Sequence, residues 1–356
     1  AFTLPIIDDI STRPSYKGDT PLCLILAPTR ELAVQVHENI CDYGKHTGTR
    51  SVVIVGGVSS GPQIDSLRRG VDFVVATPGR LIDLVEQGEV ILDDVEFLIL
   101  DEADRMLDMG FVHDVRWIAD KVPTPRQTLL FSATISPEVK SLASTMQTDP
   151  EHVAVAPPAT VADNIDEQIM FVDKLNKRDV LLHLLNRDST EQTLVFTATK
   201  VAASLVAKQR DSAGIRAVAI HSNKTQAQRA SALKSFVNGR AQVLVATDIV
   251  ARGIDVANIS HVINDEMPEN SENYIHRIGR TARAGRKGSA VSLVCIEDVS
   301  YLRGVLRLLQ EDEVQVVDDH PWHSPLVAGA FESAERAGRS RARAGKGRGS
   351  GSTWNR

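Results

Sequence analysis

Phe97-Leu98-Ile99-Leu100-Asp101-Glu102-Ala103-Asp104 places four apolar residues directly before three carboxylates in four positions. An uninterrupted apolar run that ends in charge is typical of a parallel β-strand covered on both faces. In open α/β sheets, ligands bind beyond the carboxyl ends of such strands. Adjacent carboxylates there suit Mg²⁺, and one of them can orient an attacking water. The alternative is structural, because acids also complement the dipole at a helix N-terminus.

Length and composition indicate two domains without a membrane span. The chain has 356 residues, and 42% of them are hydrophobic, which is enough for two cores. The three cysteines, Cys23, Cys41 and Cys295, lack Cys-x-x-Cys spacing, which argues against a zinc site or a disulfide framework and indicates a reducing compartment. No apolar run approaches the roughly 20 residues of a membrane helix. We therefore expect a cytoplasmic protein with no membrane contact.

The net charge of −6 conceals a basic C-terminus on an acidic body. Residues 335–356 contain six Arg, one Lys and one Glu, so they carry +6 and the remainder carries −12. Their Arg, Gly, Ala and Ser content cannot bury enough apolar surface to fold, and such basic arms attract phosphate backbones. We expect a disordered basic tail over 319–356 that attaches to nucleic acid, the alternative being a solubilising terminus.

Strand-like and helix-like segments alternate along both halves of the chain. Strands are predicted at Leu22–Leu26, Val52–Val55, Phe73–Val75, Phe97–Leu100, Thr128–Phe131, Ile169–Val172, Leu194–Phe196, Ala217–Ile220, Val243–Val245, His261–Ile263 and Ala290–Val294. Helices are predicted at Glu31–Tyr43, Gln63–Arg69 and Arg80–Glu86, and another is indicated by Leu233, Phe236 and Val237 at i, i+3 and i+4 before a capping Gly239. This alternation predicts βαβ units and parallel sheets.

The pattern breaks at Ala156–Asn164, where paired prolines favour an extended linker. The predicted organisation is a first domain over 1–155, a linker over 156–166, a second domain over 167–318 and the tail over 319–356.

Polar clusters follow the predicted strands in a particular order, and together they resemble the motifs of DEAD-box RNA helicases. The first half contributes Pro28-Thr29-Arg30-Glu31-Leu32-Ala33, Gly56-Gly57, Thr77-Pro78-Gly79-Arg80, Asp101-Glu102-Ala103-Asp104 and Ser132-Ala133-Thr134. The second half contributes Phe196-Thr197-Ala198-Thr199-Lys200, Gln226 with Arg229, Ala246-Thr247-Asp248, Arg252-Gly253-Ile254-Asp255 and His276-Arg277-Ile278-Gly279-Arg280-Thr281-Ala282-Arg283. The resemblance implies an α/β fold with two RecA-like parallel-sheet domains in tandem.

The resemblance also implies an ATP site with Mg²⁺. Asp101 would hold Mg²⁺ through water, and Glu102 would position or deprotonate the water that attacks the γ-phosphate. Arg280 and Arg283, three apart near the start of an expected helix, would act as arginine fingers, which are worth roughly 10³ to 10⁵ in rate. The remaining residues that the resemblance places at the nucleotide, or at its link to the rest of the site, are Asp104, Ser132, Thr134, Gly253, Asp255 and His276.

For RNA, the resemblance implies contacts to the backbone that are independent of sequence. Helix N-termini with Thr, Gly and Arg provide such contacts. The matching positions are Pro28, Thr29, Arg30, Gly57, Thr77, Arg80, Arg229 and Thr247. Aromatic residues make up only 4% of the chain, so a base-stacking platform is not expected.

One motif of the family is absent. The string Gly-x-x-x-x-Gly-Lys-Ser/Thr, whose amides and Lys cradle phosphates, does not occur, and the upstream adenine-reading glutamine motif is missing too. In the family, the phosphate loop precedes a segment similar to Ala1–Ile6. We therefore expect an N-terminally truncated first domain that lacks a strand, binds ATP poorly and hydrolyses almost none.

Smaller features of the sequence favour one subgroup of the family, and two alternative functions remain. Asn223-Lys224-Thr225-Gln226 and the Arg-rich tail resemble the bacterial RhlE-type subgroup, while Asp265 occupies a position often held by Tyr. The main expectation is an ATP-dependent RNA helicase, acting as a monomer on RNA and possible partners such as the ribosome or RNA-decay proteins. The alternative is an ATP-incompetent module that binds or anneals RNA. A DNA translocase is disfavoured by the joint occurrence of these motifs.

Overall fold

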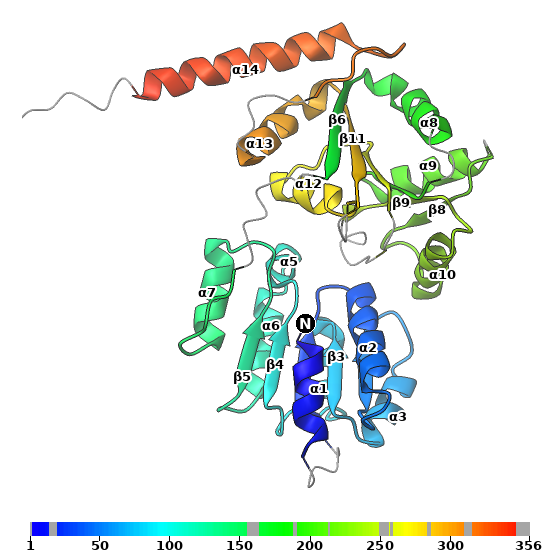
Figure 1. Cartoon of the computed structure of the whole chain (residues 1–356). Coiled ribbons are helices and arrows are strands. Elements are labelled where there is room, and N and C mark those ends of the chain that lie inside the picture. Colours follow the sequence, from blue (N-terminus) through cyan, green and yellow to red (C-terminus); the bar gives the residue numbers. More distant parts are fainter. Residues whose placement is uncertain are drawn as a thin grey trace, which may run out of the picture. The chain divides into compact units, whose positions relative to one another are not determined.

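The computed structural model describes residues 2–13, 20–154, 164–187, 191–212, 214–248, 256, 259–282, 286–309 and 315–346. The chain divides into two compact units, Ala1–Ala156 and Pro157–Arg356, and each is built on its own parallel sheet (Figure 1). Within these described residues, no helix combines the length and apolarity that crossing a membrane requires.

The first unit contains a five-stranded sheet in the order β2-β3-β1-β4-β5. Its strands are β1 (Cys23–Leu26), β2 (Ser51–Ile54), β3 (Phe73–Ala76), β4 (Phe97–Leu100) and β5 (Gln127–Leu130). Every neighbouring pair is parallel, as the sequence predicts. The sequence analysis also expects this domain to lack one strand relative to the family, and that expectation remains a prediction.

Helices cover both faces of the first sheet, which explains why its central strands are apolar throughout. The helices are α1 (Thr3–Ser11), α2 (Arg30–Gly44), α3 (Gly61–Arg68), α4 (Pro78–Glu86), α5 (Ala103–Asp108), α6 (Val112–Lys121) and α7 (Pro137–Met146). In β1, Leu24 and Leu26 pack with α3 to α7, whereas Cys23 and Ile25 pack with α1 and α2. Polar side chains can therefore gather only in the turns where the strands end.

The second unit contains a six-stranded parallel sheet in the order β6-β11-β10-β7-β9-β8. Its strands are β6 (Ile165–Phe171), β7 (Thr193–Phe196), β8 (Ala217–Ile220), β9 (Val243–Ala246), β10 (His261–Asn264) and β11 (Gly288–Val294). All the predicted strands of both halves are thus present, with ends that shift by a few residues. Strand β6 begins inside the stretch expected to be linker.

The helices of the second unit also lie on both faces of its sheet. They are α8 (Lys177–Arg187), α9 (Lys200–Ser212), α10 (Gln226–Val237), α12 (Ser271–Ile278), α13 (Val299–Leu309) and α14 (Pro325–Lys346), with short 3-10 turns at Lys174–Asn176 and Ile296–Asp298. Helices α8 and α9 share one hydrophobic cluster with the sheet, whereas α10, α12, α13 and α14 pack in clusters on the other face.

Helix α10 shows where the periodicity holds and where it fails. Phe236 is buried and Leu233 packs against the same cluster, but Val237 is 52% exposed. The helical spacing predicts that Val237 packs in the core with Leu233 and Phe236, and this was wrong for Val237, which is the last residue of the helix. Gly239 has a φ of +68° just beyond the helix, as expected of a C-terminal glycine.

The C-terminal segment differs from the expected disordered tail. Residues 315–324 lie along β6, with a parallel bridge from Ile169 to Val316 and an antiparallel bridge from Val172 to His323. Helix α14 then packs on the sheet through Val327, which is 1% exposed, and Phe331, whose ring centroid lies 5.3 Å from that of Phe171. A few well-placed apolar residues outweigh the polar average of the segment. Residues 347–356 lie outside the described part.

The docking of α14 can be tested with two neighbouring residues in its first turn. Val327→Asp should destabilise the contact between α14 and β6 by about 3 kcal/mol, because it places a carboxylate in an apolar cluster. Leu326→Asp, at a position 72% exposed, should change it by less than about 0.5 kcal/mol. Amide hydrogen exchange in α14 and β6 measures both, and equal effects of the two variants would contradict the packing described here.

Candidate functional site

The acidic turn after β4 has an unusual backbone. Glu102 has a φ of 53° and a ψ of 54°, a left-handed conformation that costs non-glycine residues roughly 1–3 kcal/mol. Its carboxylate pairs with Arg105 at 2.5 Å, and Arg105 is only 5% exposed. Asp101 is joined to the neighbouring strand, since its N–H donates to the carbonyl of Leu26 at 3.0 Å. One of the two predicted catalytic carboxylates, Glu102, thus has a strained backbone, as is common at functional sites.

The electrostatics of Asp101 fit a cation. Burial, with the negative charge of Glu102 as a second cause, raises the pKa of Asp101 to about 6. A carboxylate whose charge is disfavoured in this way is stabilised by a bound divalent ion. The described residues contain no group of three or more Asp, Glu, His or Cys side chains placed to hold a metal alone. A carboxylate that shares Mg²⁺ with phosphates and waters does not need such a group.

Asp104 joins the turn after β4 to the turn after β5. Its carboxylate accepts from the N–H and the hydroxyl of Thr134 at 3.0 and 3.1 Å. The Asp104 N–H donates to Ser132 Oγ at 3.3 Å, and that hydroxyl donates to the carbonyl of Thr134 at 2.7 Å. The structure thus brings together the three residues that the sequence predicted to be linked.

A second cluster forms at the ends of β1 and β2. Thr29 caps α2 by accepting from the Leu32 N–H at 3.4 Å, directly after the buried Pro28. The guanidinium of Arg30 lies against Gly57, where an added Cβ would come within 2.2 Å of it. Gly57 also has a φ of +75°. The positive φ therefore favours glycine at position 57, and any larger residue there would also displace the Arg30 guanidinium.

Gln63 holds this glycine turn in place, a role that the sequence analysis missed. It is 6% exposed, and its side chain accepts from the Val55 N–H at 3.2 Å and donates to the Val55 carbonyl at 3.1 Å. The signal for it was an amide residue near the start of a helix that faces a glycine turn. A hydrogen-bonded amide in an apolar setting usually fixes a loop.

The predicted RNA residues after β3 are also at this edge of the sheet. Thr77 precedes α4 without using its hydroxyl as a cap. Arg80 donates to the carbonyl of Val58 at 3.3 Å and lies 3.8 Å from Asp83. In the first unit, all the predicted site residues thus lie in the turns that follow β1 to β5 or in the first turn of the helix that comes next.

In the second unit, Arg277 connects two predicted motifs. It is 1% exposed and makes a two-pronged ion pair with Asp248, at 2.6 and 2.8 Å. It also donates to the Asn264 side chain at 3.2 Å and to the Glu266 carbonyl at 2.6 Å. Since Asp248 follows Thr247, Arg277 fixes the predicted RNA residue Thr247 relative to α12. The sequence analysis quoted Arg277 within a motif without giving it a role.

Arg280 lies just beyond α12, which contradicts its expected place near a helix start. The helix ends at Ile278, and Gly279 follows as its cap. Arg280 Nε donates back to the carbonyl of His276 at 3.0 Å, so these two predicted nucleotide residues do lie together. A positive φ of 56° at Ala282 turns the chain further. The predicted residues Gly253, Asp255 and Arg283 lie outside the described residues.

Arg229 occupies the N-terminal part of α10, as the RNA prediction required. Thr225 and Gln228 form a reciprocal capping box that fixes the start of this helix. Arg229 itself is 8% exposed.

Comparisons with known proteins identify the family of this chain. A model of DEAD/DEAH box helicases matches residues 1–142, and one of the helicase conserved C-terminal domain matches residues 176–285. A solved DEAD box protein from Methanococcus jannaschii is 35% identical, with a TM-score of 0.50, over 89% of this chain and 84% of that one. The chain belongs to the DEAD-box family.

Other relatives of this DEAD-box protein are fungal. It is 44% identical to the ATP-dependent RNA helicase DBP2 of Chaetomium thermophilum and 43% identical to dbp2 of Neurospora crassa, over 88% of this chain in both cases. The chain spans 58% and 57% of those proteins. The fold of S. cerevisiae Dbp5 bound to RNA and ADP BeF3 matches with a TM-score of 0.80 at 28% identity, over 96% and 86% of the chains. These findings do not support the expected RhlE-type subgroup.

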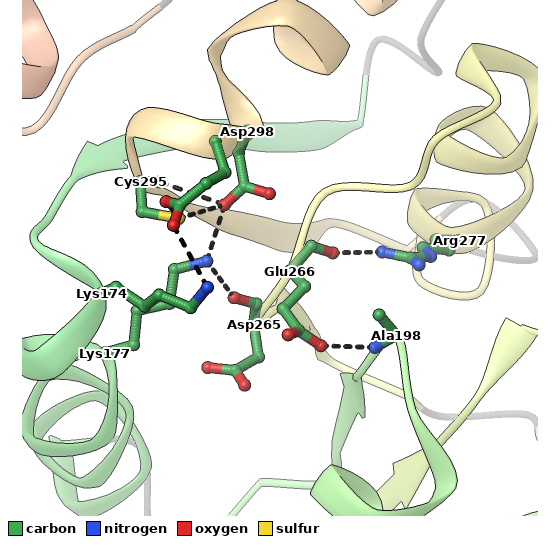
Figure 2. A network of polar contacts seen from close by, with 9 residues as sticks. Lys174, Lys177, Ala198, Asp265, Glu266, Arg277, Cys295 and Asp298 are labelled. Atoms are coloured by element: carbon green, nitrogen blue, oxygen red, sulfur yellow. Dashed lines mark hydrogen bonds and ion pairs between the residues drawn. The ribbon is translucent and has the colours of Figure 1, made fainter.

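A polar network next to Arg277 includes the position at which this DEAD-box protein departs from the expected Tyr (Figure 2). Lys177 donates to Asp298 and to the carbonyl of Asp265, both at 2.7 Å. Cys295 donates to the same Asp298 carboxylate at 3.0 Å, and Glu266 accepts from the Ala198 N–H at 2.5 Å. The network ties together the turns that follow β7, β10 and β11.

Asp265 makes a pH-dependent contribution to the stability of this DEAD-box protein. Burial raises its pKa from 3.8 to about 6, against the opposing effect of Lys177. Because the folded state then holds the proton more tightly than the unfolded state, stability should fall as pH rises from about 4 to 6.

We expect Asp265→Asn to stabilise the second unit by about 1–3 kcal/mol at pH 7.5, with a gain that shrinks as the pH is lowered to 5. Hydrogen exchange of the β10 amides measures this. Asp319→Asn, at an exposed position, is the control and should have little effect at either pH. A gain that is constant with pH would show that the charge of Asp265 is not its cause.

Proposed function

We propose that the protein is an ATP-dependent RNA helicase, in which ATP hydrolysis is coupled to local RNA strand separation or to remodelling of RNA–protein complexes. The observation that supports this most directly is the hydrogen-bonded set Asp104, Ser132 and Thr134, which lies directly after Asp101 and the strained Glu102. This set joins the acidic turn after β4, whose carboxylates suit phosphate chemistry, to the end of the neighbouring strand β5. The names of the fungal DBP2 relatives point to the same activity.

For the nucleotide, each residue has a proposed role. Asp101 would hold Mg²⁺, which when bound would neutralise charge on the phosphate oxygens. Glu102 would orient the attacking water and accept its proton. Arg280 and Arg283 would stabilise charge in the transition state, with His276, Gly253 and Asp255 contributing to nucleotide binding.

For RNA, the proposed contacts are to phosphates and sugars. Arg30 supplies a cation whose position is set by Gly57, and Thr29 and Thr77 lie at the N-termini of α2 and α4, where backbone N–H groups favour anions. Arg80, Arg229 and Thr247 complete the set, the last being held through Asp248. S. cerevisiae Dbp5 bound to RNA and ADP BeF3 has a similar fold, which supports RNA as the substrate.

A second candidate is an RNA-binding or annealing module that does not hydrolyse ATP. The observation in its favour is that the 356 residues contain no Gly-x-x-x-x-Gly-Lys-Ser/Thr string. Without the amides and Lys of that loop, the β- and γ-phosphates lose their main ligands. We propose that the polypeptide as given binds ATP poorly. A monomer in the cytoplasm, with the ribosome or RNA-decay proteins as partners, is part of the proposal.

RNA-stimulated ATP hydrolysis decides between the two candidates. We expect little turnover from the 356-residue chain, and turnover from a form extended upstream through its natural sequence to include a phosphate loop. In the extended form, Glu102→Gln should lower the rate by about 10²-fold or more, because it removes the base. Glu38→Gln, on the exposed side of α2, is the matched control and should leave the rate unchanged.

The outcomes separate the candidates. Glu102-dependent turnover by the 356-residue chain alone would refute the claim that it binds ATP poorly. If both forms bind RNA but neither hydrolyses ATP, the helicase proposal is wrong and the RNA-binding module is the better candidate.

A pair of glycine variants tests the RNA role of Arg30. Gly57 and Gly88 both have positive φ, +75° and +73°, but only at Gly57 would a Cβ meet the Arg30 guanidinium. Both Gly→Ala changes should cost about 1 kcal/mol of stability. Only Gly57→Ala should also weaken binding of single-stranded RNA, by about tenfold, because it displaces Arg30. Fluorescence anisotropy measures this, and equal binding by both variants would remove Arg30 from the proposed RNA contacts.

A further inference from the structure

The two edges of the second sheet are treated differently. The outer strand β6 is covered by the chain's own residues 315–324, which bridge to Ile169 and Val172. The outer strand at the other edge, β8, pairs only with β9 among the described residues. An edge strand directs half of its N–H and C=O groups away from its single neighbour, and natural proteins rarely leave such an edge open.

A hollow of about 630 Å³ lies along the open edge of β8. Three successive residues of β8 line it: Ala217, Val218 and Ala219. Successive side chains of a strand point to opposite faces, and accordingly Ala217 and Ala219 pack with the α9 cluster, whereas Val218 packs with the α10 cluster. A hollow that all three residues line must therefore face the edge of the strand.

Helices α9 and α10 form the two walls of this hollow, one from each face of the sheet (Figure 1). The walls are built mainly from small residues, Ser204, Ala207, Ala227, Ser231, Ala232 and Ser235. Small side chains leave space between the helices beside the strand. The result is a slot that runs along the edge of β8 between the two helices.

The slot is surrounded by positive charge. Residues 200–240 contain eight Lys or Arg and one Asp, in a protein whose net charge is −6. Lys208 and Lys224 line the hollow itself, and the neighbouring Arg216, Lys234 and Arg240 are exposed. Lysine is often placed at open edges to prevent aggregation. Beside a hollow that follows the strand edge, however, these charges can also select a partner of opposite charge.

We propose that the edge of β8, between α9 and α10, is a docking site for an extended acidic segment of a partner protein, which adds to the sheet as a further strand. Main-chain hydrogen bonds to β8 provide affinity, and Lys208 and Lys224 select acidic side chains. A peptide is favoured over RNA because the hollow follows the edge of a β-strand, with no aromatic residue among those that line it.

The test uses two synthetic heptapeptides, each with alternating Glu and Val. One has an ordinary backbone, and the other is N-methylated at alternate residues, so it keeps its charges but loses main-chain donors. Binding to the full chain is measured by fluorescence anisotropy, and the binding site by hydrogen exchange of the β8 amides. We expect the first peptide to bind and to slow exchange at Ala217–Ile220 but not in β6, and the second to bind at least about tenfold more weakly.

Charge variants complete the test. Lys208→Glu with Lys224→Glu should weaken binding by at least about tenfold. Arg307→Glu with Arg336→Glu, an equal charge change at exposed positions of α13 and α14, should weaken it by less than about twofold. Equal binding of both peptides, or equal effects of both double variants, would reduce the site to non-specific charge and overturn the proposal. The proposal would also be overturned if octauridine RNA slowed hydrogen exchange in β8 and the unmodified peptide did not, or if neither of them slowed it.

Discussion

Parallel strands that are covered on both faces leave only their end turns for polar chemistry, and this constraint organises the whole protein. In the first unit, Leu24 and Ile25 of β1 face opposite helical layers and are both completely buried. The residues that can meet a ligand are therefore forced into five adjacent turns. The strain at Glu102 and the contact between Arg30 and Gly57 both occur there, where backbone geometry is not set by the sheet.

Side-chain hydrogen bonds convert these neighbouring turns into connected sites. Asp104 connects the turns after β4 and β5, and Arg277 connects the turn after β9 to α12 and to the turn after β10. In each case, one charged residue, half-buried at Asp104 and buried at Arg277, forms several hydrogen bonds to residues distant in sequence. Breaking such a group leaves buried polar atoms without partners, which is more costly than losing a surface ion pair. The site residues are thus positioned by the same bonds that stabilise each unit.

The sequence predicted the strands well because a strand that is buried on both faces has an uninterrupted run of apolar residues, as in Phe73–Ala76 and Phe97–Leu100. It predicted the acidic turn and its link to Ser132 and Thr134 because those motifs are specific. It failed for α14, where Val327 and Phe331 dock a segment whose average composition is polar and basic. It also missed Gln63, Arg277 and the position of Arg280, since partners distant in sequence and helix ends leave no local periodic signal.

The covering of β6 has a consequence for biosynthesis. Strand β6 is the first strand of its sheet to be made, but its only partners among the described residues are β11 and the segment near Val316, more than a hundred residues later. At about 5–20 residues per second, the ribosome needs on the order of ten seconds to supply them. During that interval, β6 is an unpaired strand attached to a growing chain. The second unit can therefore complete its sheet only after β11 and the segment near Val316 have been synthesised.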